Sequence, residues 1–263
     1  MEPNRKILYG KYLFAHLKIG NNIKKYIKNV YMDIFCGITQ YENIELLQCL
    51  NIKTIESITN PPKSLQSIIL VMGHANNTIN NFPPISYLKF LNCYLFNNPL
   101  NNLPKTLHTL KLKICYEFNQ ALDNLPENLH TLSIIDCHKF NQPLDKLPQN
   151  LKILKIRSQN LNRSLDNLPK NLEKLEIDIS NSYAPLTFNH LPESLKSLKI
   201  ISHQFDYPIY NLPKTLESLF MVCVNFNKKL DNLPSSLQSL TLYGNKFNKS
   251  LDNLPPLLQS FDF

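Results

Sequence analysis

Apolar residues recur along most of the chain with two superimposed periods. Over short stretches they alternate with polar residues, as in Leu110-x-Leu112 and Leu132-x-Ile134, which is the pattern of a half-buried β-strand. The same stretch returns at a regular spacing behind a Leu-Pro pair, with prolines at 104, 126, 148, 169, 192, 213, 234 and 255. Weaker copies follow Pro62 and Pro83. Such self-similarity indicates a stack of about ten repeats of 21–22 residues.

Each repeat has room for one short strand and an extended return. Leu107, Leu110, Leu112 and Cys115 follow the LxxLxLxxN/C pattern of leucine-rich repeats. The recurring proline fixes φ at about −65° and disfavours helix. We therefore expect a mainly β solenoid, with a leucine-rich-repeat-like parallel β-sheet and an extended or polyproline convex side. Ten or eleven strands at ~4.8 Å would give a sheet roughly 50 Å long.

Three ladders of side chains are expected along the stack. Inward leucines would form the core, and the phenylalanine of a recurrent Phe-Asn pair, as at Phe118-Asn119, would fill the outer wall. Asparagine amides both donate and accept hydrogen bonds, so they suit buried turns. We expect the asparagines that precede Leu-Pro to face one another there; they lie at 60, 81, 102, 124, 167, 211, 232 and 253.

The repeated unit resembles a known family. The motif Phe-Asn-x-x-Leu-Asp-Asn-Leu-Pro-x-x-Leu-x-x-Leu, seen from Phe226 to Leu240 and from Phe247 to Phe261, is similar to the FNIP repeat, a leucine-rich-repeat variant known from social amoebae and giant viruses. The resemblance covers about residues 58–263 and is interrupted at Ser182-Tyr183. It implies a protein-interaction module, which in this family is sometimes fused to an F-box or a kinase domain.

The two ends of the chain depart from the repeat. Residues 23–34 carry an apolar stripe at helical spacing, which predicts a helical N-terminal cap over residues 1–45, ahead of a solenoid over 46–263. The run Leu47-x-x-Leu50-x-Ile52 is expected to be its first strand. The alternative for 1–45 is a degenerate F-box-like segment, making the chain a substrate-recognition subunit of a ubiquitin ligase. At the other end Leu258, Phe261 and Phe263 predict an uncapped strand through which the chain could self-associate.

Composition and motifs narrow the function. The 263 residues are 43% hydrophobic and 18% charged, with no apolar run near the ~18 residues that span a membrane and no secretory leader, so an intracellular, cytoplasmic location without membrane attachment is expected. The six cysteines form no CxxC pair, the seven histidines no HExxH, and GxSxG and Gly-rich phosphate loops do not occur. We expect a chain that is not an enzyme, with no catalytic residue, cofactor or metal site.

Function must then lie on the exposed side of the strands. Between the inward leucines, outward positions form columns that are basic in the middle, acidic at one point and apolar toward the C-terminus. The candidate partner-binding residues on this concave face are Lys111, Lys113, Lys155, Arg157, Glu176, Asp178, Lys199, Ile201, Phe220, Val222 and Tyr243. Ordinary β-propensity is the alternative explanation of the apolar ones.

These observations predict a non-enzymatic scaffold that binds a protein partner, of unknown identity, through the concave sheet. The net charge of +8 and the pI of 9.1 leave a basic nucleic-acid-binding surface as a further alternative. It is disfavoured because no RNP, zinc-finger or helix-turn-helix pattern accompanies the charge.

Overall fold

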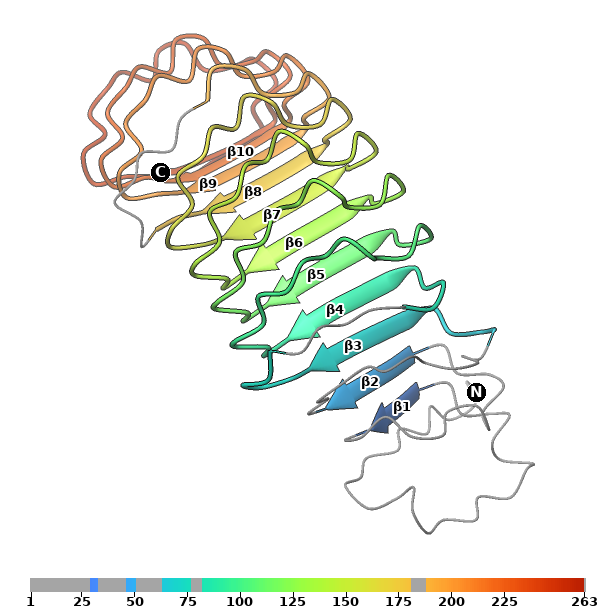
Figure 1. Ribbon diagram of the computed structural model, residues 1–263. Helices are drawn as coiled ribbons and strands as arrows, with labels where there is room; N and C mark the ends of the chain where they lie inside the picture. The colour runs from blue at the N-terminus through green and yellow to red at the C-terminus, as the bar shows by residue number, and fades with distance from the viewer. Residues whose placement is uncertain (1–28, 33–45, 51–62, 77–81, 181–187, 263) are drawn as a thin grey trace, which may run out of the picture.

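The computed structural model describes residues 29–32, 46–50, 63–76, 82–180 and 188–262 (Figure 1). All regular elements in these ranges are strands that form one parallel sheet in chain order. They are β1 (Asn29–Met32), β2 (Leu46–Leu50), β3 (Ser67–Val71), β4 (Tyr87–Leu91), β5 (Thr109–Lys113), β6 (Thr131–Ile135), β7 (Ile153–Arg157), β8 (Lys174–Asp178), β9 (Ser197–Ile201), β10 (Ser218–Val222), β11 (Ser239–Tyr243) and β12 (Ser260–Asp262). The predicted leucine-rich-repeat-like β solenoid is confirmed.

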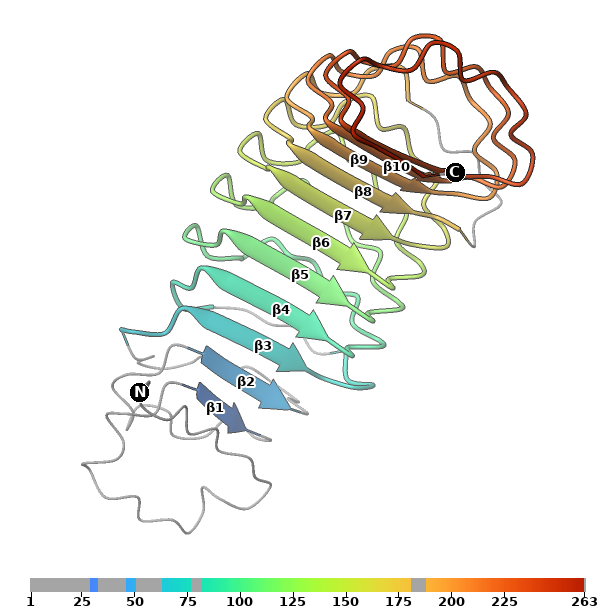
Figure 2. The same ribbon diagram turned by 180° about the vertical axis from the view of Figure 1, so that it is seen from behind.

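One face of the sheet is covered and the other is open. In Figure 2 the strands lie in front and the return segments pass behind them. In β3 to β11 the second and fourth residues of each strand are buried, whereas the first, third and fifth are mostly half-buried or exposed. We call the side of these alternate residues the open face; it corresponds to the face that the sequence predicts to be concave.

The buried leucines form one continuous core. Leu110, Leu132 and Leu154 occupy the same position in adjacent strands and are fully buried. The core extends from Leu65 to Phe247 without a break. Each repeat thus shares its interior with its neighbours, which is why no repeat is expected to fold alone.

Each repeated proline begins a tight turn. The amide of Leu107 donates to the carbonyl of Pro104, and the same bond recurs after all eight Leu-Pro prolines at 2.9–3.2 Å, as in Leu258 to Pro255. From β5 to β12 the strand starts five residues after its proline. Proline suits this place because its φ is fixed and its missing N–H is not needed by the sheet.

Phenylalanines stack inside the wall opposite the sheet. Phe96, Phe118 and Phe140 are buried and nearly parallel, with ring centroids 5.9 and 6.0 Å apart. Leu161 takes the next place in this row. The row resumes with Phe205, which stacks on Phe188 at 5.7 Å. The predicted phenylalanine ladder is confirmed, with Leu161 as a gap in it.

A different set of asparagines from the predicted one forms the hydrogen-bonded ladder. The side-chain oxygen of Asn119, from the Phe-Asn pair, accepts a bond of 2.9 Å from the backbone amide of Asn141, and Asn141 accepts likewise from Asn162. Asp206 replaces asparagine in this role toward Asn227. The asparagines before Leu-Pro are exposed where described, and no hydrogen bond between them is found there. The prediction for those positions was wrong because a turn at the surface is satisfied by water.

The repeat becomes one position shorter toward the C-terminus, and this change has a backbone cause. Strands β4 to β7 begin at positions 87, 109, 131 and 153, whereas β9 to β12 begin at positions 197, 218, 239 and 260. In the longer repeats one residue follows the strand with positive φ: Asn92 at 54°, Ile114 at 60° and Asp136 at 56°. This left-handed residue is the additional one, because Phe118 lies five positions after β5 whereas Phe226 lies four after β10.

A small residue follows the strand at the same place in several described repeats, whereas after β8 the buried Ile179 takes this place. Cys115 accepts a bond from the amide of Phe118, and Cys223 and Gly244 hold the same place before Phe226 and Phe247. A Cβ at Gly244 would lie 2.8 Å from the carbonyl oxygen of Cys223. A side chain at Gly244 would therefore collide with the backbone, and the thiols of Cys115 and Cys223 agree with the small side chain expected at this place.

At the N-terminus two predictions need correction. Val30 and Tyr31, which the apolar stripe placed in a helix, lie in strand β1, which pairs with β2. Strand formation is favoured there because β1 extends the existing sheet and both residues have high β-propensity. In β2, Leu47 rather than Leu50 aligns with Ile68, so the predicted strand is shifted by three residues. The described residues contain twelve strands, where the sequence predicted ten or eleven. The remainder of the predicted cap lies outside the described residues.

The asparagine ladder predicts different costs for two alanine substitutions. Asn119→Ala leaves the Asn141 amide without its acceptor and should lower the free energy of unfolding by about 1–3 kcal/mol. The control Asn124→Ala removes only an exposed contact to Asn101 and should cost at most about 0.5 kcal/mol. Urea unfolding followed by circular dichroism measures both. An equal loss in the two variants would contradict the assignment of the ladder.

The left-handed residues predict opposite effects of two exchanges. Ile114→Asn should raise the free energy of unfolding by about 1 kcal/mol, because β-branched side chains are strained at positive φ and asparagine tolerates it. Asn92→Ile should lower it by a similar amount for the same reason. Thermal unfolding of the two single variants checks the signs, and shifts in the same direction would exclude this explanation.

Candidate protein-binding surface

The strand register brings the predicted candidate residues onto one surface. Lys111 pairs with Ser133, which is followed in the next strands by Lys155, Glu176, Lys199 and Phe220, so these third-position residues form one column. The fifth positions form a second column: Lys113, Ile135, Arg157, Asp178, Ile201, Val222 and Tyr243. All of the candidates therefore lie on the open face, although Asp178 is only 9% exposed.

The middle of the open face is electrically balanced rather than basic. Glu176 lies between Lys155, whose Nζ is 3.0 Å from one carboxylate oxygen, and Lys199, whose Nζ is 3.6 Å from the other. In the second column Arg157 Nε donates to Asp178 at 2.7 Å and its Nη1 lies 3.5 Å from Asp136. The positive charges that the sequence places here are thus paired with carboxylates of adjacent strands.

The neighbouring lysines lower the pKa of the Glu176 carboxyl group. Partial burial raises the pKa of this carboxyl group, but the hydrogen bond from Lys155 and the charges of Lys155 and Lys199 outweigh it, so the pKa is lowered from its usual 4.5. The carboxylate therefore stays ionised when the protein is folded. The folded state binds a proton there less readily than the unfolded chain, which links this ion pair to stability.

Toward the C-terminus the open face becomes apolar. Val222 lies between Ile201 and Tyr243 in adjacent strands, and the ring of Phe220 meets that of Tyr243 edge-on at 6.3 Å. Lys199 closes this area on one side with its Nζ 4.9 Å from the Phe220 ring centroid. We call Ile201, Phe220, Val222 and Tyr243 the apolar strip. Tyr243 is 41% exposed, so the strip is accessible to a partner.

Two residues of the open face were missed by the sequence analysis. Tyr87 and Lys89 of β4 continue the columns one strand further, because Lys89 pairs with Lys111. Lys111 places its Nζ 5.4 Å from the centroid of the Tyr87 ring. The signal was available in the regular spacing from β4 to β5, but the weak Leu-Pro motif at Pro83 concealed it.

A second missed feature is a row of aromatic rings at the carboxyl ends of β3 to β6. His74 and Tyr94 lie 5.1 Å apart, Tyr94 stacks on Tyr116 at 5.5 Å, and Tyr116 stacks on His138 at 4.6 Å. The two pairs formed by Tyr94, Tyr116 and His138 are stacked, whereas His74 is tilted against Tyr94, and these contacts link successive turns. Its recurrence at the repeat spacing is the signal that could have found it.

The four cysteines whose surroundings the structure describes are buried, which does not favour reactive thiols. Cys93, Cys115, Cys137 and Cys223 are buried and unpaired. Neighbouring thiols and burial raise the pKa of Cys93, and burial raises the pKa of Cys223 to about 12. His138, the residue adjacent to Cys137, stacks on Tyr116. The thiols of Cys93 and Cys223 are therefore protonated at neutral pH, as suits a packing role.

Two hollows among the described residues are lined mainly by polar and charged side chains. One of about 230 Å³ lies at the carboxyl ends of β6 to β8, where its cation, Arg157, is held by Asp136 and Asp178. Within the described ranges no cluster of three or more histidine, cysteine, aspartate or glutamate residues is placed to bind a metal ion. No helix of membrane-spanning length and hydrophobicity occurs in that part of the chain either.

Comparison with known families decides the type of repeat. The sequence pattern of the FNIP Repeat family matches residues 140–178 and 184–223. These two segments are thus similar to FNIP repeats. The first FNIP match runs from Phe140 to the end of β8, and the second ends at Cys223, directly after β10. Phe140 and Phe205 of the phenylalanine ladder and Cys223 of the small-residue slot lie within the matched segments.

The chain also resembles solved structures. One is described as the crystal structure of CroV588, a novel circular LRR protein; identity is 23% over 84% of this chain and 43% of that one, with a TM-score of 0.49. Another is the leucine-rich-repeat domain of the type III effector XCV3220 (XopL), at 15% identity over 89% of this chain and 76% of that one, with a TM-score of 0.36. The chain spans less than half of the first protein. No curated protein matches it significantly.

The lowered pKa of Glu176 predicts a pH-dependent contribution to stability. Glu176→Gln should cost up to about 1 kcal/mol of unfolding free energy at neutral pH. The stabilisation is fully present above the usual carboxyl pKa of 4.5 and is lost as pH falls through the lowered value. The cost should therefore disappear in strong acid. Urea unfolding from pH 7 to pH 2 measures it, with Glu117→Gln, whose pair with Lys139 is more exposed, as the control. A cost independent of pH would contradict this role.

Proposed function

We propose that the protein is a non-enzymatic scaffold that binds a protein partner through the open face of its solenoid. The observation that carries the proposal is the apolar strip. Solvent-facing strand positions ordinarily hold polar residues, as Ser197, Ser218 and Ser239 do in the first column beside the strip. Four large apolar side chains in register on such a face favour a contact surface.

The surrounding chemistry supports binding rather than catalysis. Glu176 and Asp178 of the open face are engaged by lysine and arginine, and the described thiols are buried. A sheet of regularly spaced side chains presents an extended surface without a deep cleft, which suits a macromolecule better than a small substrate. The candidate residues of the balanced middle would then form the polar surround of the apolar strip.

The ubiquitin-ligase alternative concerns the N-terminal segment. Residues 1–45 fall outside the described ranges except for β1, so an adaptor role there, like the division of the chain at residue 45, stays a prediction. Self-association through β12 also stays a prediction. Phe261 of that strand is 40% exposed, and one edge of β12 is paired with β11.

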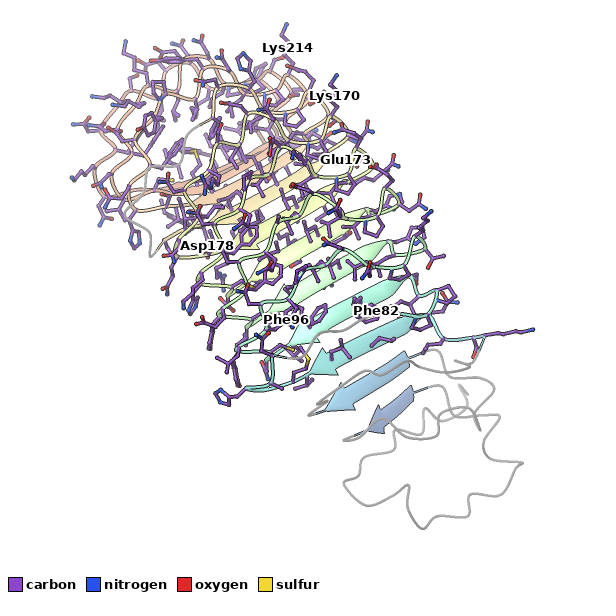
Figure 3. The ribbon with its side chains drawn as sticks, viewed as in Figure 1. Phe82, Phe96, Lys170, Glu173, Asp178 and Lys214 are labelled. Carbon is purple, nitrogen blue, oxygen red and sulfur yellow. The ribbon has the colours of Figure 1, made fainter. Side chains whose placement is uncertain are left out.

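The proposal predicts that the apolar strip is required for partner recovery. Phe220→Lys combined with Tyr243→Lys should reduce recovery of a specific partner from native host extract at least tenfold, because two apolar contacts become charged. Quantitative mass spectrometry of pull-downs compares the variant with the wild type. The control Lys170→Glu with Lys214→Glu changes exposed residues at the turns and should leave recovery within twofold (Figure 3). Undiminished recovery of every partner by a folded strip variant would contradict the proposal.

A further inference from the structure

The open face carries one group of charges that the protein does not balance. Lys89, Lys111 and Lys113 lie on the adjacent strands β4 and β5, and we call them the lysine cluster. Every ion pair found on the described open face involves Lys155, Arg157 or Lys199, and none involves the lysine cluster. Positive charge is therefore left uncompensated at this end of the surface.

The three ammonium groups influence one another. Lys89 and Lys111 are direct cross-strand partners, and Lys113 lies two residues beyond Lys111 on the same face. Partial burial lowers the pKa of Lys89, and the charges of Lys113 and Lys111 lower it further. Like charges at cross-strand positions are destabilising. A negatively charged ligand would relieve this repulsion.

The rest of the face indicates which kind of anion fits. A nucleic acid would need positive charge along the length of the groove, with arginine favoured for phosphate. Here the unpaired charge of the lysine cluster ends at β5, the arginine of the open face is held by two carboxylates, and the surface continues into the apolar strip. A polypeptide segment with an acidic cluster and separate apolar residues matches the open face better. The acidic cluster would suit the lysine cluster, and the apolar residues would suit the apolar strip.

The register sets the spacing between the two ends. Lys111 on β5 and Phe220 on β10 belong to the same column and are separated by five strand steps. At ~4.8 Å per step this distance is about 24 Å. An extended chain of about 3.3–3.6 Å per residue covers it with roughly seven residues.

We infer that the open face binds an extended segment of a partner protein in which an acidic cluster, held by the lysine cluster, lies about seven residues from an apolar anchor, held by the apolar strip. This inference rests on the proposed function and adds the chemistry and spacing of the partner. The balanced middle, from β7 to β9, would contact the intervening residues without demanding a particular charge.

Selection from a phage-displayed library of random peptides, each long enough to cover both ends of the face, tests the inference. Peptides enriched on the wild-type protein should combine an acidic cluster with an aromatic or aliphatic anchor six to nine residues away. Lys111→Glu with Lys113→Glu should weaken a selected peptide at least tenfold, as measured by fluorescence anisotropy. The control Lys170→Glu with Lys214→Glu makes the same change in net charge at the turns and should alter affinity less than twofold. Circular dichroism verifies that each variant is folded.

The other outcomes separate this inference from the proposed function. Selected peptides that depend on Phe220 and Tyr243 but lack the acidic cluster would overturn the inference and leave the proposed function standing. Peptides that depend on neither end, or no enrichment, would count against both. Tighter binding of a labelled single-stranded oligodeoxythymidine than of any selected peptide, lost in the Lys111→Glu, Lys113→Glu variant, would replace the acidic segment by a nucleic acid and overturn the inference.

Discussion

The structure depends on the stacking of like residues upon like at the spacing of parallel strands. Because successive strands are in register, every side chain meets its own counterpart from the next repeat. Leucines and phenylalanines benefit from this arrangement, since identical apolar side chains fill identical spaces, as the evenly spaced rings of Phe96, Phe118 and Phe140 show. Asparagine benefits because its side-chain oxygen is presented to the same backbone amide in each turn.

The same geometry is unfavourable for charge. A column of identical charged residues would repel itself at every strand step, so a stable column must alternate in sign, include neutral residues or bind a counter-ion. Alternation in sign is found in the middle of the column, where Glu176 lies between Lys155 and Lys199. Lys89 and Lys111 do not alternate in sign, and the stability of the sheet there must come from the core beneath them. The open face is thus divided by its electrostatics into parts with different binding properties, although its backbone is uniform.

Much of this could be predicted from the sequence because the dominant forces repeat. The proline spacing located β3 to β12, and the alternation within each strand separated core from open face. Predictions failed where the period gave no guidance: in β1, where tertiary pairing overrides a helical stripe, and in β2, where two alignments of the leucine pattern compete. The asparagine ladder was misplaced because the asparagines of the Phe-Asn pairs and those before Leu-Pro recur with the same period. Only the direction of the side chains distinguishes the Asn119 position from the position at the surface turn. Charge pairing required knowledge of the cross-strand partners themselves.

The chain of asparagine bonds has a consequence for how such a protein can change. Each asparagine accepts from the next turn, so removal or duplication of one complete turn rejoins equivalent partners, whereas a partial deletion leaves an amide without its acceptor. Gain or loss of whole turns between β5 and β10 would lengthen or shorten the surface in increments of about 4.8 Å. The distance between two binding regions of the open face could thus change in fixed increments, while the side chains of each region stay unchanged.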